Sequence, residues 1–373
     1  MSTWAVVFGG PSPEHEISIL TGLQAERVLT AAGDTVVPLY WAPAGDWFLV
    51  PGGTEARDYL DGAPKGSRPA EIRLGADAGI YVKRRALAVE ATLLTLHGGL
   101  GEGGGAAALF SLLGIPATGS SLFAGAVGMD KLAFGGLMTA SGIPTLPRQL
   151  LSETVAPGFA GPYIVKPRFG GSSIGIEIAE DVDAARAVGR ASAQLRAGAV
   201  VEPYRPELVD LNISFRTFPA LEVTAVERPL RGEGGTALYS YAEKYLSAGP
   251  GDAGFTNAPR EFPAVLPAGV AERAEDLAKR VAEVTALTGI ARVDLLLSPD
   301  GELYVNEVNS IPGAMSLYLW APTHPAAQVL RDALIEARDH PWRLPAGGFG
   351  NGAALRAAGG IAGKLVGLNG PGR

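Results

Sequence analysis

The sequence predicts an α/β region followed by α+β regions, and two observations carry this prediction. The first third alternates apolar strand-like runs with helix-like segments, the order that produces a parallel sheet. From about residue 163 onward, short strands follow one another closely, which favours hairpins. The chain has 373 residues, 47% of them hydrophobic, which is enough for two or three compact units with real cores.

The elements of the first third follow from apolar periodicity and from the residues that end helices. We expect, in order, strand 4–8, helix 17–31, strand 36–41, strand 92–97, helix 106–113 and helix 130–140. Gly114, with Pro116 just beyond, is the usual punctuation at the end of a helix. This order predicts an N-terminal α/β domain over residues 1–122.

The rest of the chain predicts a small α+β lid domain and a third unit. For the lid, residues 123–205, we expect strands 163–167, 174–178 and 200–204, with helix 182–195. For the third unit, 206–373, we expect strands 211–218 and 221–228, a polar loop 231–257, helix 268–287, two further strands and helix 326–337. The Gly- and Ala-rich tail after Pro345 suggests a frayed helix or disorder, and no chemistry.

Composition excludes several classes of function. A net charge of −7 and a pI near 5.3 argue against a nucleic acid or an anionic membrane as the main partner. The absence of cysteine excludes disulfides, thiolate nucleophiles and cysteine zinc sites, and the four histidines show no metal-binding spacing. With neither a leader sequence nor a long apolar run, we expect a cytoplasmic protein that acts on small molecules.

The two strands around residues 292–309 predict a magnesium site. Asp294 lies in an apolar strand, and Glu307 and Asn309 are two residues apart, so their side chains point to one face. Hard oxygen ligands of this kind suit Mg²⁺ shared with nucleotide phosphates. Arg292, on the same face as Asp294, could offset charge on a phosphoryl group or an oxyanion. The alternative, an ordinary strand with solvated polar residues, leaves this convergence unexplained.

A glycine-rich loop predicts phosphate binding. Lys166-Pro-Arg-Phe-Gly-Gly-Ser-Ser-Ile-Gly175 joins two strands instead of opening a helix, so it differs from a Walker A loop. Small residues would let backbone N–H groups close over phosphate oxygens, while Lys166 supplies a charge. Lys131 heads a helix and could reach the same phosphates. Either lysine taken alone is explained as well by a solvated surface charge.

Seven ordered blocks between about residues 4 and 320 resemble the D-alanine–D-alanine ligases of the ATP-grasp superfamily. The blocks are Gly9-Gly-Pro-Ser12-Pro-Glu14-His15-Glu-Ile-Ser18, His97-Gly-Gly-Leu-Gly101-Glu102, Gly114-Ile-Pro-Ala-Thr-Gly119-Ser, Met129-Asp-Lys131, Val165-Lys166-Pro with Gly171-Ser-Ser-Ile-Gly175, Tyr239-Ser-Tyr-Ala-Glu-Lys244-Tyr245, and Arg292-Val-Asp294 with Asn306-Glu307-Val-Asn309 and Pro312-Gly313. Any one block would be weak, but seven in the family's order are specific.

The resemblance implies an ATP-grasp fold of three subdomains, with the nucleotide between the second and third. It implies ligation of two D-alanines through an acyl phosphate, for peptidoglycan synthesis. ATP would bind with Mg²⁺, two ions held by Asp294, Glu307 and Asn309, and Mn²⁺ could substitute. Lys131 and Lys166 would neutralise phosphate charge. The protein would act on small molecules, without nucleic acid or membrane, and could form a homodimer.

The resemblance also assigns roles around the amino acids. The residues so assigned are Glu14 for the first ammonium, Ser172 and Tyr245 in a triad with it, Lys244 for the γ-phosphate, Arg292 and the Gly313 N–H for the oxyanion, and His97 for the substrate. Glu16 is a weaker candidate than Glu14, which could equally be a first-turn helix carboxylate. Closure of loop 231–257 would protect the acyl phosphate from water.

The chain departs from the family pattern where the substrates would bind. Gly103 and Ala107 stand where the family usually has Asp and Gln, and Gly170 where Glu is common. At the second substrate's carboxylate the family commonly has Ser, whereas this chain has Tyr318, with Ser316 two residues earlier. We expect both to contact that substrate, unless Tyr318 is part of a core-packing run.

The nucleotide side also departs from the pattern. We expect Glu202 to line the nucleotide site, and either Asp210 or Glu207 to bind the ribose.

Three functions compete. The leading one is a D-Ala–D-Ala ligase, and the next is an ATP-grasp amino-acid ligase that takes a different second substrate or serves specialised metabolism. The third is a catalytically silent ATP-binding protein, which would have no need for transition-state groups such as Arg292 and Lys244.

Overall fold

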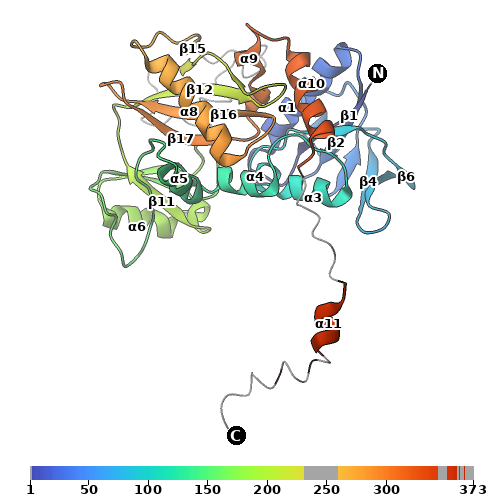
Figure 1. The fold of residues 1–373 in the computed structure, drawn as a ribbon, viewed down its shortest axis with the longest axis horizontal. Helices are drawn as coiled ribbons and strands as arrows, with labels where there is room; N and C mark the ends of the chain where they lie inside the picture. Colours follow the sequence, from blue (N-terminus) through green and yellow to red (C-terminus); the bar gives the residue numbers. More distant parts are fainter. Residues whose placement is uncertain (1, 231–258, 343–350, 359–360, 362–364, 366–373) are drawn as a thin grey trace. The chain divides into compact units, whose positions relative to one another are not determined.

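The computed structural model describes residues 2–230, 259–342, 351–358, 361 and 365. The chain divides into two units, Met1–Pro341 and Trp342–Arg373. In the second unit the described residues include a short helix, α11 (Ala353–Ala358). All other elements belong to the first unit (Figure 1).

The first sheet has the predicted parallel centre and an antiparallel extension that the sequence did not reveal. β1 (Thr3–Gly9) runs parallel to both β2 (Thr35–Trp41) and β7 (Ala91–Leu94). The strands missed are β3 (Trp47–Leu49), β4 (Arg68–Arg73), β5 (Gly79–Val82) and β6 (Arg85–Ala86), giving the order β6-β5-β4-β3-β2-β1-β7. They are short, and most of β4 is not buried, so apolar alternation is weak there.

Helix α1 (His15–Ala31) packs on this sheet and begins two residues earlier than predicted. Gly22 allows the close approach, because a Cβ at this position would lie 2.5 Å from the Cβ of Phe8. Two of the following helices confirm predicted ones, α3 (Gly105–Leu113) and α5 (Lys131–Ala140), whereas α2 (Gly99–Glu102) and α4 (Leu122–Met129) were not predicted. α3 ends at Gly114 with φ 68°, as its glycine predicts.

The second sheet is antiparallel and small. Its order is β10 (Glu177–Ala179), β9 (Tyr163–Pro167), β11 (Ala199–Pro203) and β8 (Gln149–Leu150), covered by α6 (Val182–Ala191) and the 3₁₀ turn η2 (Ala193–Leu195). The strand predicted over 174–178 begins three residues later than expected, at Glu177. Residues before 177 instead form a turn in which Ser172 and Ser173 have φ of 53° and 59°.

The third sheet carries the predicted polar strands. Its order is β13 (Glu222–Val223), β12 (Val209–Arg216), β16 (Ile290–Leu297) and β17 (Leu303–Asn309), all antiparallel, with α8 (Val270–Thr285) packed against it. The single strand predicted over 221–228 was wrong. It is divided into β13 and β14 (Arg228–Pro229), and β14 pairs with β15 (Arg260–Glu261) in a separate two-stranded ribbon.

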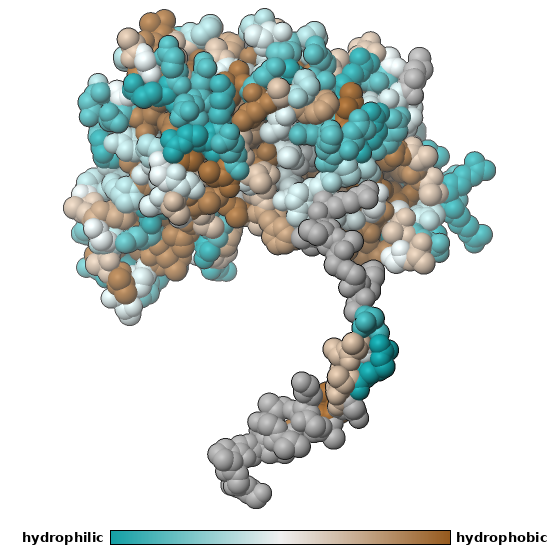
Figure 2. All heavy atoms as spheres, in the orientation of Figure 1, coloured by the Kyte–Doolittle hydropathy of each residue, from teal (hydrophilic) through white to brown (hydrophobic). Residues whose placement is uncertain are grey.

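The last elements of this unit join the first core and not the third. η3 (Gly313–Ser316), α9 (Leu317–Trp320) and α10 (Ala326–Asp339) contribute Met315, Trp320 and Leu330 to the cluster around β1. Residues of the C-terminal part therefore belong to two hydrophobic cores. The domain limits 1–122, 123–205 and 206–373 stay a prediction. On the face shown in Figure 2, hydrophilic and hydrophobic residues are interspersed. Within the described part of the chain, no helix is long and apolar enough to span a membrane.

Candidate functional site

One cavity collects most of the residues predicted to carry function. Its walls come from the glycine-rich loop and β9, from β11 and β12, and from β16, β17 and β15. The predicted residues that line it are Lys131, Lys166, Ser172, Glu202, Asp210, Arg292, Asp294, Glu307, Asn309, Gly313 and Tyr318. Segments far apart in the sequence therefore meet at one cavity, as the family resemblance implied.

The three predicted metal ligands lie together on adjacent strands. Asp294 of β16 is in register with Glu307 of β17, and the Asn309 amide donates a hydrogen bond to Asp294 Oδ2 at 3.1 Å. A bulge between Asp294 and Leu295 interrupts the ladder at this point, a common feature beside functional sites. The arrangement offers two carboxylates and an amide oxygen from one patch of sheet.

Arg292 is held tightly by one of these carboxylates. Its Nε and Nη2 donate to the two oxygens of Asp294 at 2.7 and 2.9 Å. Burial alone would lower the pKa of Arg292, but the charge of Asp294 holds it well above its ordinary value. Arg292 is therefore a fixed cation whose direction is set by a bidentate contact.

Two lysines face the carboxylates across the cavity lining. Lys131 Nζ lies 3.4 Å from Glu307 Oε2 and donates to the Gly170 carbonyl at 2.5 Å. Lys166 Nζ donates to Glu202 Oε2 at 2.7 Å and to Asn306 Oδ1 at 3.3 Å. Both lysines are at least nine-tenths buried. Buried amines with such partners are not solvated surface charges, so this alternative to the phosphate role loses its support.

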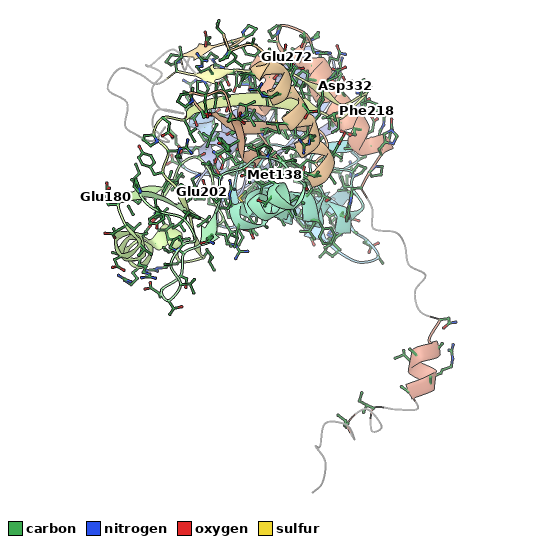
Figure 3. All side chains as sticks on the ribbon, turned by 60° about the vertical axis from the view of Figure 1, so that its left-hand side comes forward. Met138, Glu180, Glu202, Phe218, Glu272 and Asp332 are labelled. Atoms are coloured by element: carbon green, nitrogen blue, oxygen red, sulfur yellow. The ribbon has the colours of Figure 1, made fainter. Side chains whose placement is uncertain are left out.

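Glu202 fixes the position of Lys166. It is 1% exposed, and its second oxygen lies 3.4 Å from Arg148 Nε. Burial would raise the pKa of Glu202, but the charges of Lys166 and Arg148 lower it below its ordinary value. Figure 3 labels Glu202, which projects from β11. Its carboxylate therefore fixes Lys166, and Arg148 is a site residue that no motif indicated.

The two candidates for binding a ribose occupy different positions. Asp210 of β12 lines the cavity, whereas Glu207 does not and instead pairs with Arg205 in a half-exposed contact. This placement favours Asp210 as the acid on the nucleotide side, which the sequence left open.

Glu14 sits at the N-terminal end of α1 and turns toward the glycine-rich loop. Its carboxylate is 8% exposed, makes no side-chain cap hydrogen bond, and accepts a hydrogen bond from the Ser172 hydroxyl. Gly98 leaves room for this carboxylate, because a Cβ there would lie 2.3 Å from Glu14 Oε2. Glu16, the weaker candidate, is exposed. The structure thus joins Glu14 to Ser172 over 158 residues of sequence.

Glu102 lies close to Glu14. It belongs to the block that begins at His97, which assigned it no role. It accepts hydrogen bonds from the Gly98 and Ile311 N–H groups at 3.0 and 3.3 Å. Burial, and then the charge of Glu14, raises the pKa of Glu102 to about 7. A carboxyl with such a pKa changes its charge near neutral pH, a property that often marks functional sites.

Buried side chains support the turn that follows Gly313. Ala314, Met315 and Ser316 all have φ near 50°, a left-handed conformation that is strained for residues other than glycine. The Ala314 N–H donates to Thr21 Oγ1 at 3.3 Å, and the same hydroxyl contacts His97 Nε2 at 2.8 Å. His97 is buried, does not line the cavity and supports this turn. Its contact with the substrate stays a prediction.

Ser316 and Tyr318 diverge. Ser316 is fully buried, lies in the left-handed turn and does not line the cavity. Its contact with the second substrate's carboxylate stays a prediction. Tyr318 does line the cavity, and its hydroxyl donates to Glu227 at 3.3 Å. Glu227 and Arg260 complete this part of the wall, and neither belongs to a motif that could have revealed it. Lys244 and Tyr245 lie outside the described residues.

Taken together, the fold and the cavity lined by its antiparallel strands are those of an ATP-grasp enzyme. Two family models confirm this class. The model of the D-Ala–D-Ala ligase N-terminus matches residues 3–120, and that of the D-Ala–D-Ala ligase C-terminus matches residues 126–336. The chain therefore belongs to the D-alanine–D-alanine ligase family, whose members are ATP-dependent ligases.

Similar proteins agree with this assignment. A D-alanine–D-alanine ligase of Mycolicibacterium vanbaalenii is 33% identical over 351 residues, covering 85% of this chain and 91% of its own. That of Mycobacterium tuberculosis (strain ATCC 25177 / H37Ra) is 31% identical, covering 89% and 94%. Among solved structures, the VanG D-Ala:D-Ser ligase of Enterococcus faecalis superposes with a TM-score of 0.74 at 22% identity, covering 90% and 99%. At this identity the structural match shows the shared fold alone.

Proposed function

We propose that this protein joins two D-alanines at the expense of ATP, through an acyl phosphate, for peptidoglycan synthesis. The observation that carries the proposal is the cavity itself. It places two buried lysines beside Asp294, Glu307 and Asn309, with the fixed cation Arg292 among them. The full-length similarity to D-alanine–D-alanine ligases supports the choice of substrate.

The residues present fit a divalent metal. Asp294 and Glu307 are in register across two strands, and rotation of the Asn309 amide would offer its oxygen beside them. Hard oxygen donors of this kind suit Mg²⁺, two ions in our proposal, with Mn²⁺ as a substitute. Bound metal would neutralise phosphate charge and hold the phosphates in line.

The chain's own residues then divide the remaining work. Lys131 and Lys166 would bind phosphate oxygens, and Glu202 keeps Lys166 aimed at the cavity. Asp210 would accept from the ribose hydroxyls. The loop at Gly170 and Gly171, which offers little steric hindrance, would let backbone N–H groups approach the phosphates.

The donor and oxyanion positions follow from Ser172, Arg292 and Gly313, which line the cavity, and from Glu14, which does not line it but contacts Ser172. Glu14 and Ser172, which already contact each other, would hold the ammonium of the first D-alanine so that its carboxylate meets the γ-phosphate. Arg292 and the Gly313 N–H would stabilise the oxyanion formed when the second amine attacks. Lys244 and Tyr245, outside the described residues, keep their predicted roles at the γ-phosphate and beside Glu14.

The test is a coupled assay of ADP release with D-Ala alone, L-Ala alone, and D-Ala paired with other D-amino acids, with mass spectrometry of the product. We expect D-Ala–D-Ala to form and L-Ala to be inert. ATP turnover that depends on no amino acid would contradict the proposal.

A D-Ala–D-X ligase is the second candidate, and one observation favours it. Tyr318 stands in the cavity wall where the family commonly has serine, so the acceptor pocket has a different chemistry. A cytoplasmic location would agree with the use of ATP. Homodimer formation stays a prediction, which light scattering would test.

A further inference from the structure

Four polar side chains that no motif joined meet in the wall of the cavity. They are Asn212 of β12, Glu227 beside β14, Arg260 of β15 and Tyr318 of α9. The cluster acts on Arg292, because the charge of Glu227 is one of the causes that raise the pKa of Arg292. We call these four residues the ribbon cluster, after the β14–β15 ribbon.

Glu227 is the hub of the ribbon cluster. It is 4% exposed, and one of its oxygens accepts from Asn212 Nδ2 at 3.0 Å and from the Tyr318 hydroxyl at 3.3 Å. Its other oxygen lies 3.5 Å from Arg260 Nη1. A buried carboxylate with three partners fixes the direction of each of them.

In this geometry the Tyr318 hydroxyl cannot bind the second substrate's carboxylate, which is the role of serine in the family pattern. A hydroxyl has one proton to donate, and that of Tyr318 is directed at Glu227. It therefore cannot also be donated to the carboxylate of a bound amino acid. Another group must bind that carboxylate if the second substrate is an amino acid.

Arg260 has the chemistry and the position for this role. Its guanidinium lies over the Tyr318 ring, 4.4 Å from the centroid, and its side chain lines the cavity at 16% exposure. Stacking on a ring and contact with a carboxylate both restrict a guanidinium, so little further entropy is lost on binding. Arginine is also the side chain best suited to pair with a carboxylate.

We propose that Arg260 binds the carboxylate of the second substrate, with Tyr318 and Glu227 as positioning residues that hold its guanidinium. The acceptor is then an α-amino acid with a free carboxylate, and the Tyr318 ring forms a wall of its pocket. This inference rests on the proposed ligase function, and it assigns the acceptor subsite to residues that differ from the serine of the family pattern.

The experiment compares two acceptors, D-Ala and D-alaninamide, with D-Ala as donor. D-alaninamide has no carboxylate to be phosphorylated, so it reports on the acceptor position alone. In the wild type we expect a strong preference for D-Ala as acceptor. Arg260→Gln should raise the KM for acceptor D-Ala roughly 10- to 100-fold, as expected for loss of a charged hydrogen bond. It should change turnover with D-alaninamide much less, so that the preference collapses.

Matched variants separate binding from folding. Arg228 lies in the same ribbon, pairs with Glu261 at 2.9 Å, and does not line the cavity. Arg228→Gln should therefore keep the wild-type preference. Arg260→Lys keeps the charge and should restore part of the preference. Glu227→Gln removes the charge that orients Arg260, and should raise the acceptor KM with a smaller change in kcat.

The outcomes distinguish the two levels of the proposal. A wild type that releases no ADP with any pair of D-amino acids would overturn the ligase function and the subsite with it. An active wild type whose preference for D-Ala over D-alaninamide survives in folded Arg260→Gln would overturn the subsite alone. A rise confined to the KM for ATP would also overturn it, by placing Arg260 on the nucleotide side.

Discussion

The two ends of the proposed amino-acid site differ in how far the sequence motifs predict them. At the donor end, Glu14 and Ser172 belong to blocks that resemble the family, and the structure joins them directly. At the acceptor end, Glu227 and Arg260 lie outside every block, and Tyr318 replaces the expected serine. In the proposed reaction the donor must present a carboxylate to ATP, whereas the chemical step requires only an amine of the acceptor. This comparison suggests that the chemistry of the reaction restricts the donor end, while the acceptor end can vary and set specificity.

The largest effect should come from the metal site, which both ends share. We expect Glu307→Gln to fold normally and to lose turnover by several orders of magnitude, because a neutral amide cannot offset phosphate charge. Glu302 immediately precedes the same strand but is exposed and does not line the cavity, so Glu302→Gln is the matched control. Near wild-type ADP release from folded Glu307→Gln would contradict the assignment of the metal site.

The donor end should be the next most sensitive. Ser172→Ala removes the hydroxyl that donates to Glu14, and Glu14→Gln removes the charge that would hold the ammonium. We expect each to raise the KM for donor D-Ala roughly 10- to 100-fold. The KM is measured by varying the donor at a saturating concentration of a different acceptor. Glu16→Gln, two residues further along and exposed, should be silent. A change in the acceptor KM alone would reverse our placement of the two ends.

The fold was largely predictable because the apolar patterns of the central strands agree with their burial. β1 and β2 were placed to within one residue at each end, since their apolar runs are clear. β3 to β6 were missed because short, partly exposed strands carry no strong period. Motifs predicted the carboxylates and lysines that line the cavity. Glu227, Arg260 and Arg148, in contrast, make contacts distant in sequence that no local pattern encodes.

The acceptor end should respond both to loss of the Tyr318 hydroxyl and to loss of its ring. Tyr318→Phe removes the hydroxyl that orients on Glu227 and should cost about 1–3 kcal/mol in kcat/KM with D-Ala, as for an unpaired buried group. Tyr318→Ala should admit bulkier D-amino acids, since selection on this scale is worth about 10- to 200-fold. Rates across D-Ala, D-Ser, D-lactate and larger acceptors would show it. The same acceptor preference in both variants would place Tyr318 in the core and not in the pocket.

The smallest effect should concern stability, through the buried histidine beneath the Gly313 turn. Burial lowers the pKa of His97 from its ordinary value to about 4. Between these values the unfolded chain binds a proton that the folded chain excludes, so stability is present above pH 6.5 and is lost as the pH falls. The loss from pH 7 to 5.5 should be about 1 kcal/mol.

Urea unfolding of the wild type and of His97→Gln at pH 7 and pH 5.5 would measure this contribution. Glutamine keeps a polar group for Thr21 but does not titrate, so the variant should lose less stability on acidification than the wild type. Glu102 contributes a slope of opposite sign, because its raised pKa costs stability as the pH rises, but this slope is common to both proteins and cancels in the difference. The same substitution at exposed His340 serves as the control. Parallel pH profiles for the wild type and His97→Gln would show that His97 is not held neutral beneath the turn that presents Gly313 and Tyr318 to the site.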